Sequence, residues 1–122
     1  MSDPRHELGR RAEAAVATWL GRRGWRILDR RWRGSRGELD LVCLDPGGVL
    51  VGIEVKLRTT GRAGSGAESV DRRRVARLRA ALAAYAVGGM VAHVDTRLDL
   101  VTVEPGEGGG WRLRRQPGID AW

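Results

Sequence analysis

Residues 49–58 read VLVGIEVKLR, an alternating pattern that predicts a β-strand over residues 49–57. Its odd-numbered positions are all apolar, whereas Glu54 and Lys56 stand among the even ones, which face the other side of a strand. Lys56 is the only lysine among the 22 lysine and arginine residues of the chain. A lysine kept beside a glutamate in an apolar strand, in a chain that otherwise uses arginine, points to a specific role.

The preceding stretch predicts a partner strand. Residues 38–44 read ELDLVCL, and the turn sequence DPGG at 45–48 joins them to the next strand as a hairpin. Burying the apolar residues of both strands together pairs odd positions with odd ones, since a slip of one residue would place carboxylates beside valines. This pairing predicts that four charged residues share one face of the hairpin: Glu38, Asp40, Glu54 and Lys56.

Asp40 opposite Glu54 would place their Cβ atoms about 5 Å apart, and carboxylates so close repel unless a cation lies between them. One candidate is Lys56, a compact amine whose pKa burial can lower. The other is a metal ion, with Mg²⁺ or Mn²⁺ favoured over Zn²⁺ by oxygen-only ligands. Asp40, Glu54 and the Val55 carbonyl would bind this ion for phosphodiester hydrolysis, and Lys56 would orient water or neutralise phosphate charge. A cross-strand salt-bridge cluster, pairing Glu38 with Lys56, is the structural alternative.

The remaining patterns predict two helices and three more strands. Asp3-Pro4 starts a helix that ends near Gly24, and Ser69 or Asp71 starts a second one that ends at Gly88-Gly89. The further strands cover residues 25–33, 97–104 and 111–116. Together these elements predict an α/β fold: one domain over residues 1–122, with a mixed β-sheet flanked by helices in the order α-β-β-β-α-β-β.

The net charge of +7 and the pI near 11.2 favour a polyanionic partner, most simply nucleic acid. A general bias towards arginine would give the same charge without a partner. Cys43 stands alone, which excludes a disulfide framework and a cysteine-based zinc site and suits the cytosol. Residues 1–7 lack an apolar signal region, and the uncharged run 80–94 is too short to span a bilayer. We therefore expect a cytoplasmic protein without membrane segments.

Five arginines near the hairpin and the second helix are candidate phosphate contacts, suited to sequence-independent binding of a nucleic-acid backbone. A solvated arginine face is the alternative for each of them. The tryptophans at 19, 25, 32 and 111 fit core or half-buried packing better than base stacking. The predicted nucleic-acid-binding residues are Arg36, Arg58, Arg72, Arg73 and Arg74.

Residues 36–42 (RGELDLV) followed by 53–56 (IEVK) resemble the D…ExK motif of the restriction-endonuclease-like nucleases. With residues 9–15 (GRRAEAA) and 97–103 (RLDLVTV), the chain resembles the YraN family of small bacterial predicted endonucleases, which is distantly similar to archaeal Holliday-junction resolvases. The resemblance covers nearly the whole chain in the same order and spacing. It implies a single restriction-endonuclease-like domain.

The resemblance also implies roles for individual residues. Asp40, Glu54 and Lys56 match the catalytic set, and Glu13 matches a helix glutamate that helps to bind the metal, although an exposed helix residue is the alternative. Glu38 belongs to the motif as a supporting residue that could pair with an arginine. The loop that faces phosphate in such nucleases is here the glycine-rich stretch 59–66, which leaves a fixed substrate contact there in doubt.

The function expected from these features is a Mg²⁺- or Mn²⁺-dependent endonuclease that hydrolyses phosphodiester bonds, with branched or damaged DNA in repair or recombination as candidate substrates. DNA is favoured over RNA, and a homodimer would suit the nicking of two strands symmetrically. The main alternative is a non-catalytic nucleic-acid-binding module whose acidic cluster is structural or degenerate. A third is an adaptor whose basic face docks an acidic protein.

Overall fold

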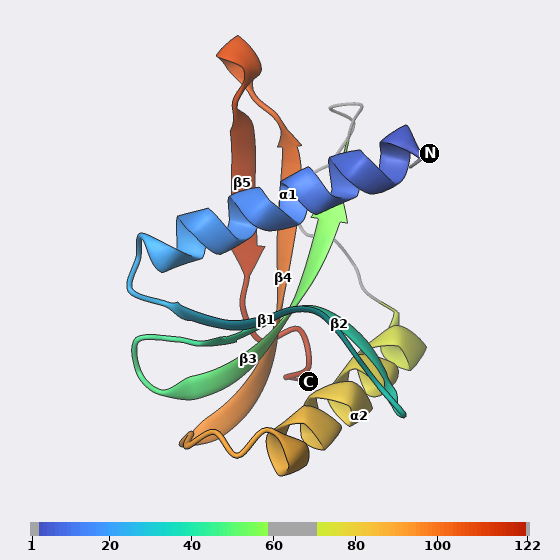
Figure 1. Ribbon diagram of the computed structural model, residues 1–122, viewed down its shortest axis with the longest axis vertical. Helices are drawn as coiled ribbons and strands as arrows, with labels where there is room; N and C mark the ends of the chain where they lie inside the picture. Colours follow the sequence, from blue (N-terminus) through green and yellow to red (C-terminus); the bar gives the residue numbers. More distant parts are fainter. Residues whose placement is uncertain (1–2, 59–70, 122) are drawn as a thin grey trace.

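The computed structural model describes residues 3–58 and 71–121 (Figure 1). The predicted order of helices and strands is confirmed, with one short 3-10 turn in addition. The first helix ends at Gly21, earlier than Gly24, because the chain already turns at residues 22–24. The loop 59–66 and Ser69 lie outside the described residues. The elements are α1 (Pro4–Gly21), β1 (Arg26–Gly34), β2 (Gly37–Leu44), β3 (Val49–Leu57), α2 (Arg72–Gly88), β4 (Asp95–Pro105), η1 (Glu107–Gly109) and β5 (Trp111–Gln116).

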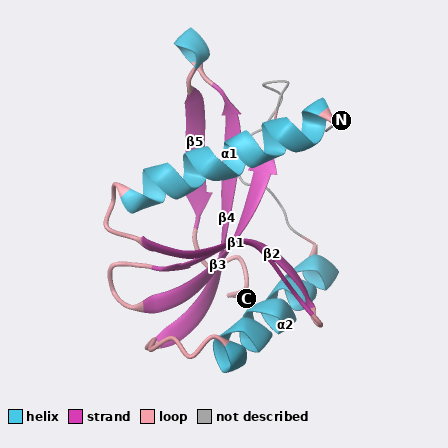
Figure 2. Cartoon of the chain, in the orientation of Figure 1, coloured by secondary structure: helices cyan, strands magenta, loops and turns pink. Residues whose placement is uncertain are grey.

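The five strands form one mixed sheet in the order β1-β2-β3-β4-β5 (Figure 2). Neighbouring strands are antiparallel except for β3 and β4, which run parallel. Parallel neighbours need a long crossover, and α2 lies between β3 and β4 in the chain. No helix within the described part of the chain is long and apolar enough to cross a membrane.

The two helices cover opposite faces of the sheet (Figure 1). The side chains of Leu41, Ile53 and Val101 are buried against α1 in one apolar cluster. Those of Val42 and Leu50 are buried against α2 in the other. This alternation along β2 and β3 is the one that the apolar pattern predicts, because neighbouring residues of a strand point to opposite faces.

The alternation breaks at Leu39. As odd-numbered residues of the stretch 38–44, Leu39 and Leu41 are predicted to share a face of the strand, and this prediction is wrong. Leu39 is buried in the cluster beneath α2, together with Val42. The pairing of β1 with β2 includes the residues on either side of Arg31 and Asp40 but not those two. Arg31 has a left-handed backbone with φ 49°, a conformation uncommon outside glycine. Beyond this break, the turn between β1 and β2 lies beside α2, where a Cβ at Gly37 would touch Ala81 (Figure 1).

Candidate active site

Asp40 lies where β2 separates from β3. The two strands pair from Leu44 and Leu50 to Leu41 and Ile53, the register that the apolar pattern predicts. Beyond that pair the backbone N–H of Val55 donates to Oδ2 of Asp40 at 2.8 Å. A side chain thus accepts a hydrogen bond of β3 at the point where the strands separate, and the half-buried Asp40 carboxyl is held in the opening of the sheet.

The carboxyl groups of Asp40 and Glu54 are hydrogen-bonded to each other, as expected for the two residues that come next to the last pair, Leu41 and Ile53, on facing strands. Burial raises the pKa of Asp40 to about 8, and the hydrogen bond and charge of Glu54 act in the same direction. The Val55 N–H opposes this shift. Near neutral pH and without a cation, the pair therefore shares a proton, as closely spaced carboxylates do.

Glu54 is nearly buried, with 7% of its side chain exposed, and its partner is Arg74 in the first turn of α2. The Nε of Arg74 donates to Oε2 of Glu54 at 2.5 Å. Burial opposes the ionisation of Glu54, but hydrogen bonds from Arg74 and Asp40 and the charges of Arg74 and Lys56 outweigh it, so the pKa of Glu54 lies below its ordinary value. Glu54 is therefore the ionised member of the carboxyl pair.

The pairing of Arg74 with Glu54 was not predicted, since Arg74 had been expected to contact nucleic acid. A signal for it exists in the sequence. Arg74 lies four residues before Leu78 and seven before Ala81, both of which are buried in α2. An arginine at that spacing continues the buried stripe of the helix, and the sheet beneath it offers Glu54 as a counter-ion.

Glu13 and Glu38 flank the pair without joining it. Glu13 on α1 forms an ion pair with Arg31 of β1 at 3.9 Å, and burial raises its pKa. Its charge also contributes to the raised pKa of Asp40. Glu38 is exposed and pairs with Nε of Arg33 at 3.2 Å. Its partner is an arginine, as expected, and not Lys56 as in the salt-bridge alternative.

The other four predicted phosphate-binding arginines lie in the turn between β1 and β2, directly after β3 and in the first turn of α2. Arg36 is exposed in the turn between β1 and β2, and Arg58 directly follows β3, where its backbone N–H donates to the carbonyl of Val103 at 2.8 Å. Arg72 and Arg73 are exposed in the first turn of α2. The contacts of these four arginines with phosphate stay predictions.

A cleft of about 350 Å³ lies between β2 and α2 and is lined by Glu38, Asp40, Arg74 and Arg77 among others. Arg77 was not among the predicted binding residues, although it stands one helical turn after Arg74 on the same face. The cleft thus combines two carboxyl groups, those of Glu38 and Asp40, with two guanidinium groups. Guanidinium groups are the usual ligands of phosphate oxygens. Within residues 3–58 and 71–121, no three His, Cys, Asp or Glu side chains gather closely enough to hold a metal ion.

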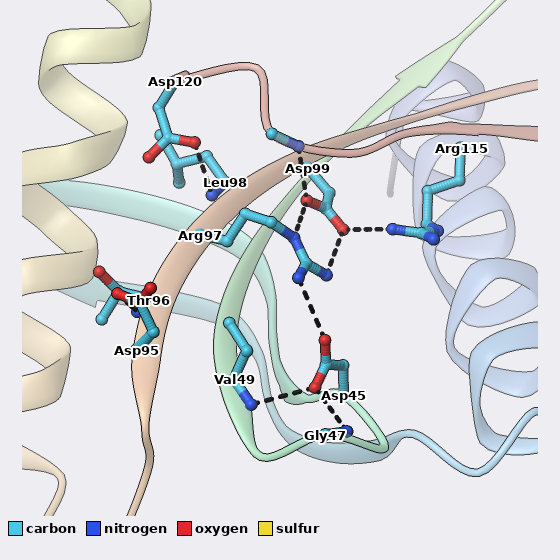
Figure 3. A network of polar contacts seen from close by, with 11 residues as sticks. Asp45, Gly47, Val49, Asp95, Thr96, Arg97, Leu98, Asp99, Arg115 and Asp120 are labelled. Atoms are coloured by element: carbon cyan, nitrogen blue, oxygen red, sulfur yellow. Dashed lines mark hydrogen bonds and ion pairs between the residues drawn. The ribbon is translucent and has the colours of Figure 1, made fainter.

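A second buried carboxylate, Asp99, has a structural role (Figure 3). Oδ1 accepts hydrogen bonds from Arg97 Nε at 2.8 Å and Gly118 N–H at 3.0 Å. Oδ2 accepts from Arg97 at 3.1 Å and Arg115 at 2.8 Å. Arg97 also donates to Asp45 in the hairpin turn at 3.1 Å. Asp99 is fully buried, and both of its oxygen atoms accept hydrogen bonds. Through Arg97 and Arg115 it connects β4 with β5 and with the hairpin turn at Asp45.

Comparison with known proteins places the chain beside a defined family. The sequence profile of the "Uncharacterised protein family UPF0102" matches residues 12–103. A UPF0102 protein of Anaeromyxobacter dehalogenans (strain 2CP-C) is 46% identical over 106 residues, which cover 87% of this chain and 78% of that protein. A UPF0102 protein of Bordetella avium (strain 197N) is 41% identical over 105 residues, or 86% and 72%. One of Arthrobacter sp. (strain FB24) is 38% identical over 112 residues, or 92% and 94%.

Proposed function

We propose that this chain, which belongs to the UPF0102 family, is a divalent-metal-dependent endonuclease that hydrolyses phosphodiester bonds of DNA. UPF0102 is also called YraN, so the resemblance seen in the sequence is confirmed at the level of the family. The family description names no activity. The observation that supports the proposal is the carboxyl pair of Asp40 and Glu54, which lies in an opening of the sheet beside a cleft lined by Arg74 and Arg77.

The donor set of this pair fits Mg²⁺ or Mn²⁺. Mg²⁺ prefers oxygen ligands, and it is commonly bound through one or two carboxylates together with water and substrate phosphate. Two carboxyl groups in contact, one of which keeps a proton at neutral pH, form a pair whose repulsion a divalent cation would relieve. A bound cation would supply Lewis-acid activation of water and of the phosphoryl group. The Val55 carbonyl and Glu13 remain candidate additional ligands.

The residues around the pair have separable roles in this proposal. Arg74 holds the Glu54 carboxylate in place through Nε and is half exposed, so its guanidinium can also meet a phosphate oxygen in the cleft. Arg77 would bind an adjacent phosphate from the same helix face. Lys56, two residues after Glu54 and close enough to lower its pKa, would orient the attacking water or neutralise charge that develops on phosphorus.

One observation favours the second candidate function, a non-catalytic nucleic-acid-binding module. Arg74 already neutralises Glu54, and a proton can neutralise Asp40, so the acidic pair is satisfied without a metal ion. In that case the arginines of the cleft would bind the phosphate backbone with no cleavage. The affinity would then depend on salt but not on divalent cations.

The two functions are separated by incubating the protein with labelled branched, single-stranded and duplex DNA in Mg²⁺, Mn²⁺ or EDTA. A nuclease should cleave only with the cation, and Asp40→Asn should abolish cleavage. Asp95→Asn is the matched control, because Asp95 is an exposed aspartate at the start of β4. Cleavage retained by Asp40→Asn would reject the site. Binding without cleavage, unchanged by the cation, would establish the binding module instead.

A further inference from the structure

An open groove of about 690 Å³ lies between α1 and β5, away from the carboxyl pair of Asp40 and Glu54. Its walls include two tryptophans, Trp19 of α1 and Trp111 of β5. Three arginines of α1 and the turn that follows it, Arg11, Arg22 and Arg23, line it as well. The groove thus combines large aromatic surfaces with a concentration of positive charge, and the carboxyl site does not account for it.

The tryptophans belong partly to the core and partly to the groove. Both rings are half buried and pack against the apolar cluster beneath α1, in keeping with the packing role expected from the sequence. Yet both also line the groove, so part of each side chain borders open space. Packing explains why these positions are apolar. It does not explain why arginines surround aromatic rings at the surface.

Two arginines of the groove, Arg11 and Arg22, are available for a ligand, whereas Arg23 donates to the carbonyl of Trp19 at 3.2 Å. The guanidinium of Arg23 lies over the Trp19 ring, 4.5 Å from its centroid, a favourable cation–π arrangement. Among the described residues, neither Arg11 nor Arg22 pairs with a carboxylate, and none of the lining residues is acidic. Arg11 and Arg22 stand three helical turns apart, about 16 Å along the axis of α1, a distance that several nucleotides of a strand can span.

We propose that this groove binds an unpaired strand of nucleic acid, with a base stacked against Trp111 and phosphates held by Arg11 and Arg22. Stacking on aromatic side chains within a basic groove is the way in which proteins bind single strands without reading their sequence. A duplex keeps its bases stacked on one another inside the helix and offers only phosphates to such a groove. The aromatic walls therefore select for unpaired bases.

The position of the groove relative to the carboxyl pair indicates which part of a nucleic-acid substrate it could bind. Glu13 on one flank of α1 faces Arg31 of β1, close to the carboxyl pair, whereas the groove on the other flank faces Trp111 of β5. The cleft of the carboxyl site opens on the α2 side of the sheet and the groove on the α1 side. A nucleic acid with a duplex or junction at the carboxyl site would therefore have to pass an unpaired strand around α1 to reach the groove. This connection rests on the proposed nuclease function, whereas the binding itself does not.

The test measures binding by fluorescence anisotropy in EDTA, so that no cleavage occurs. The probes are labelled oligothymidylate and oligouridylate of about 12 nucleotides and a duplex of the same length. Trp111→Leu removes the aromatic face while keeping an apolar side chain, and should weaken single-strand binding roughly 5- to 30-fold. Trp111→Phe keeps a stacking surface and should bind within about 3-fold of the wild type, which controls for packing of β5.

The charge contribution is tested separately through the salt dependence. Replacing both Arg11 and Arg22 by glutamine should reduce the slope of log K against log salt by about 1.4, or about 0.7 for each phosphate contact with a single strand. Arg114→Gln is the matched control, since Arg114 is an exposed arginine in β5 beside Leu113, which lines the groove. Side chains of neighbouring strand residues point to opposite faces, so the control slope should not change.

The outcomes separate this inference from the nuclease proposal. Equal single-strand affinity of Trp111→Leu and wild type, with folding confirmed by circular dichroism, would overturn the groove assignment, as would binding of duplex alone. Metal-dependent cleavage could still be present in that case. Conversely, weakened single-strand binding by Trp111→Leu would uphold the groove assignment even if the wild type never cuts DNA. Comparison of the two oligonucleotides shows whether the strand is DNA or RNA.

Discussion

The Oδ2 atom of Asp40 accepts the backbone N–H of Val55 at 2.8 Å, just past the last paired residues of β2 and β3. A carboxyl group thus continues the contact between two strands after their backbones have separated. This contact fixes the direction of the Asp40 side chain, since one of its oxygen atoms is tied to β3. The same carboxyl group lies beside Glu54 and lines the cleft, where a cation or a proton can be held.

Replacement of Lys56 should show whether this residue orients the attacking water or only supplies a positive charge. Lys56→Arg keeps a positive charge beside Glu54 but replaces a compact amine by a planar guanidinium, which presents its donors in a different geometry. If Lys56 orients the attacking water, DNA cleavage by Lys56→Arg should fall by about 100-fold or more, while binding measured in EDTA should change little. Arg114→Lys, the reverse exchange at an exposed site, should leave both unchanged. Full cleavage by Lys56→Arg would show that only charge is needed.

The Asp40 carboxyl should make the stability of the protein depend on pH. In the folded protein the pKa of Asp40 is about 8, whereas its ordinary pKa is 3.8. Over that interval the folded state binds more protons than the unfolded state, so the free energy of unfolding should fall as the pH rises from 5 to 8. Asp40→Asn resembles the protonated acid and should lack this contribution.

The measurement is urea unfolding of both proteins in EDTA at several pH values. The stability of the wild type minus that of Asp40→Asn should decrease steadily between pH 5 and pH 8. Added Mg²⁺ at pH 8 should raise the melting temperature of the wild type, because a ligand that binds the folded state stabilises it, and should have a smaller effect on Asp40→Asn. A difference that grows with pH would contradict the assigned pKa of Asp40.

Removal of Arg74 should destabilise the fold through Glu54. Arg74→Met leaves the nearly buried Glu54 carboxylate without its cation, which should cost about 1–3 kcal/mol of unfolding free energy; the half-exposed position of Arg74 keeps this value moderate. Adding Glu54→Gln to Arg74→Met should recover part of the loss, giving a coupling energy in a double-mutant cycle. Arg73→Met, at the exposed neighbouring position, should stay within about 0.5 kcal/mol of the wild type.

Asp99 provides a prediction for a carboxylate outside the proposed chemistry. Asp99→Asn removes the charge that holds Arg97 and Arg115 together at a fully buried position, and should cost about 3 kcal/mol or more. Asp95→Asn, on the exposed start of the same strand, should cost less than about 0.5 kcal/mol. Thermal unfolding monitored by circular dichroism checks both. A mild effect of Asp99→Asn would mean that the network in Figure 3 contributes little to stability.

Much of the fold follows from the apolar pattern of the hairpin. The opposition of Leu41 and Ile53, and with it the proximity of Asp40 and Glu54, is dictated by which residues can be buried together. The pattern could not reveal the break in the alternation at Leu39, because that depends on a single left-handed residue, Arg31, with no glycine to mark it. Periodicity also fixes which face of a strand a residue occupies, but not which strand lies beside it. The parallel pairing of β3 with β4 therefore could not be predicted from the sequence.

The residues of the candidate site that lie on strands could be predicted from the sequence, whereas those that lie on α2 could be predicted only in part. Lys56 stood out because it is the only lysine of the chain. Arg74 was predicted as a phosphate contact, but its pairing with Glu54 could not be distinguished among many arginines of similar spacing. Choosing among them requires knowing how α2 lies on the sheet, and that follows from the packing of Leu78 and its neighbours in three dimensions. The groove beside Trp111 was equally inaccessible, because β5 and α1 are far apart in the sequence.

The order of synthesis gives the ion pair of Glu54 and Arg74 a further consequence. A nascent chain that has left the ribosome as far as residue 58 already carries Asp40, Glu54 and Lys56, yet the helix that supplies the partner of Glu54 has not been made. The cleft has only one wall at that stage, since Arg74 and Arg77 form the other. Translation must therefore pass well beyond the strand motif before the site is assembled. Under the proposed nuclease function, an unfinished chain would have no complete active site.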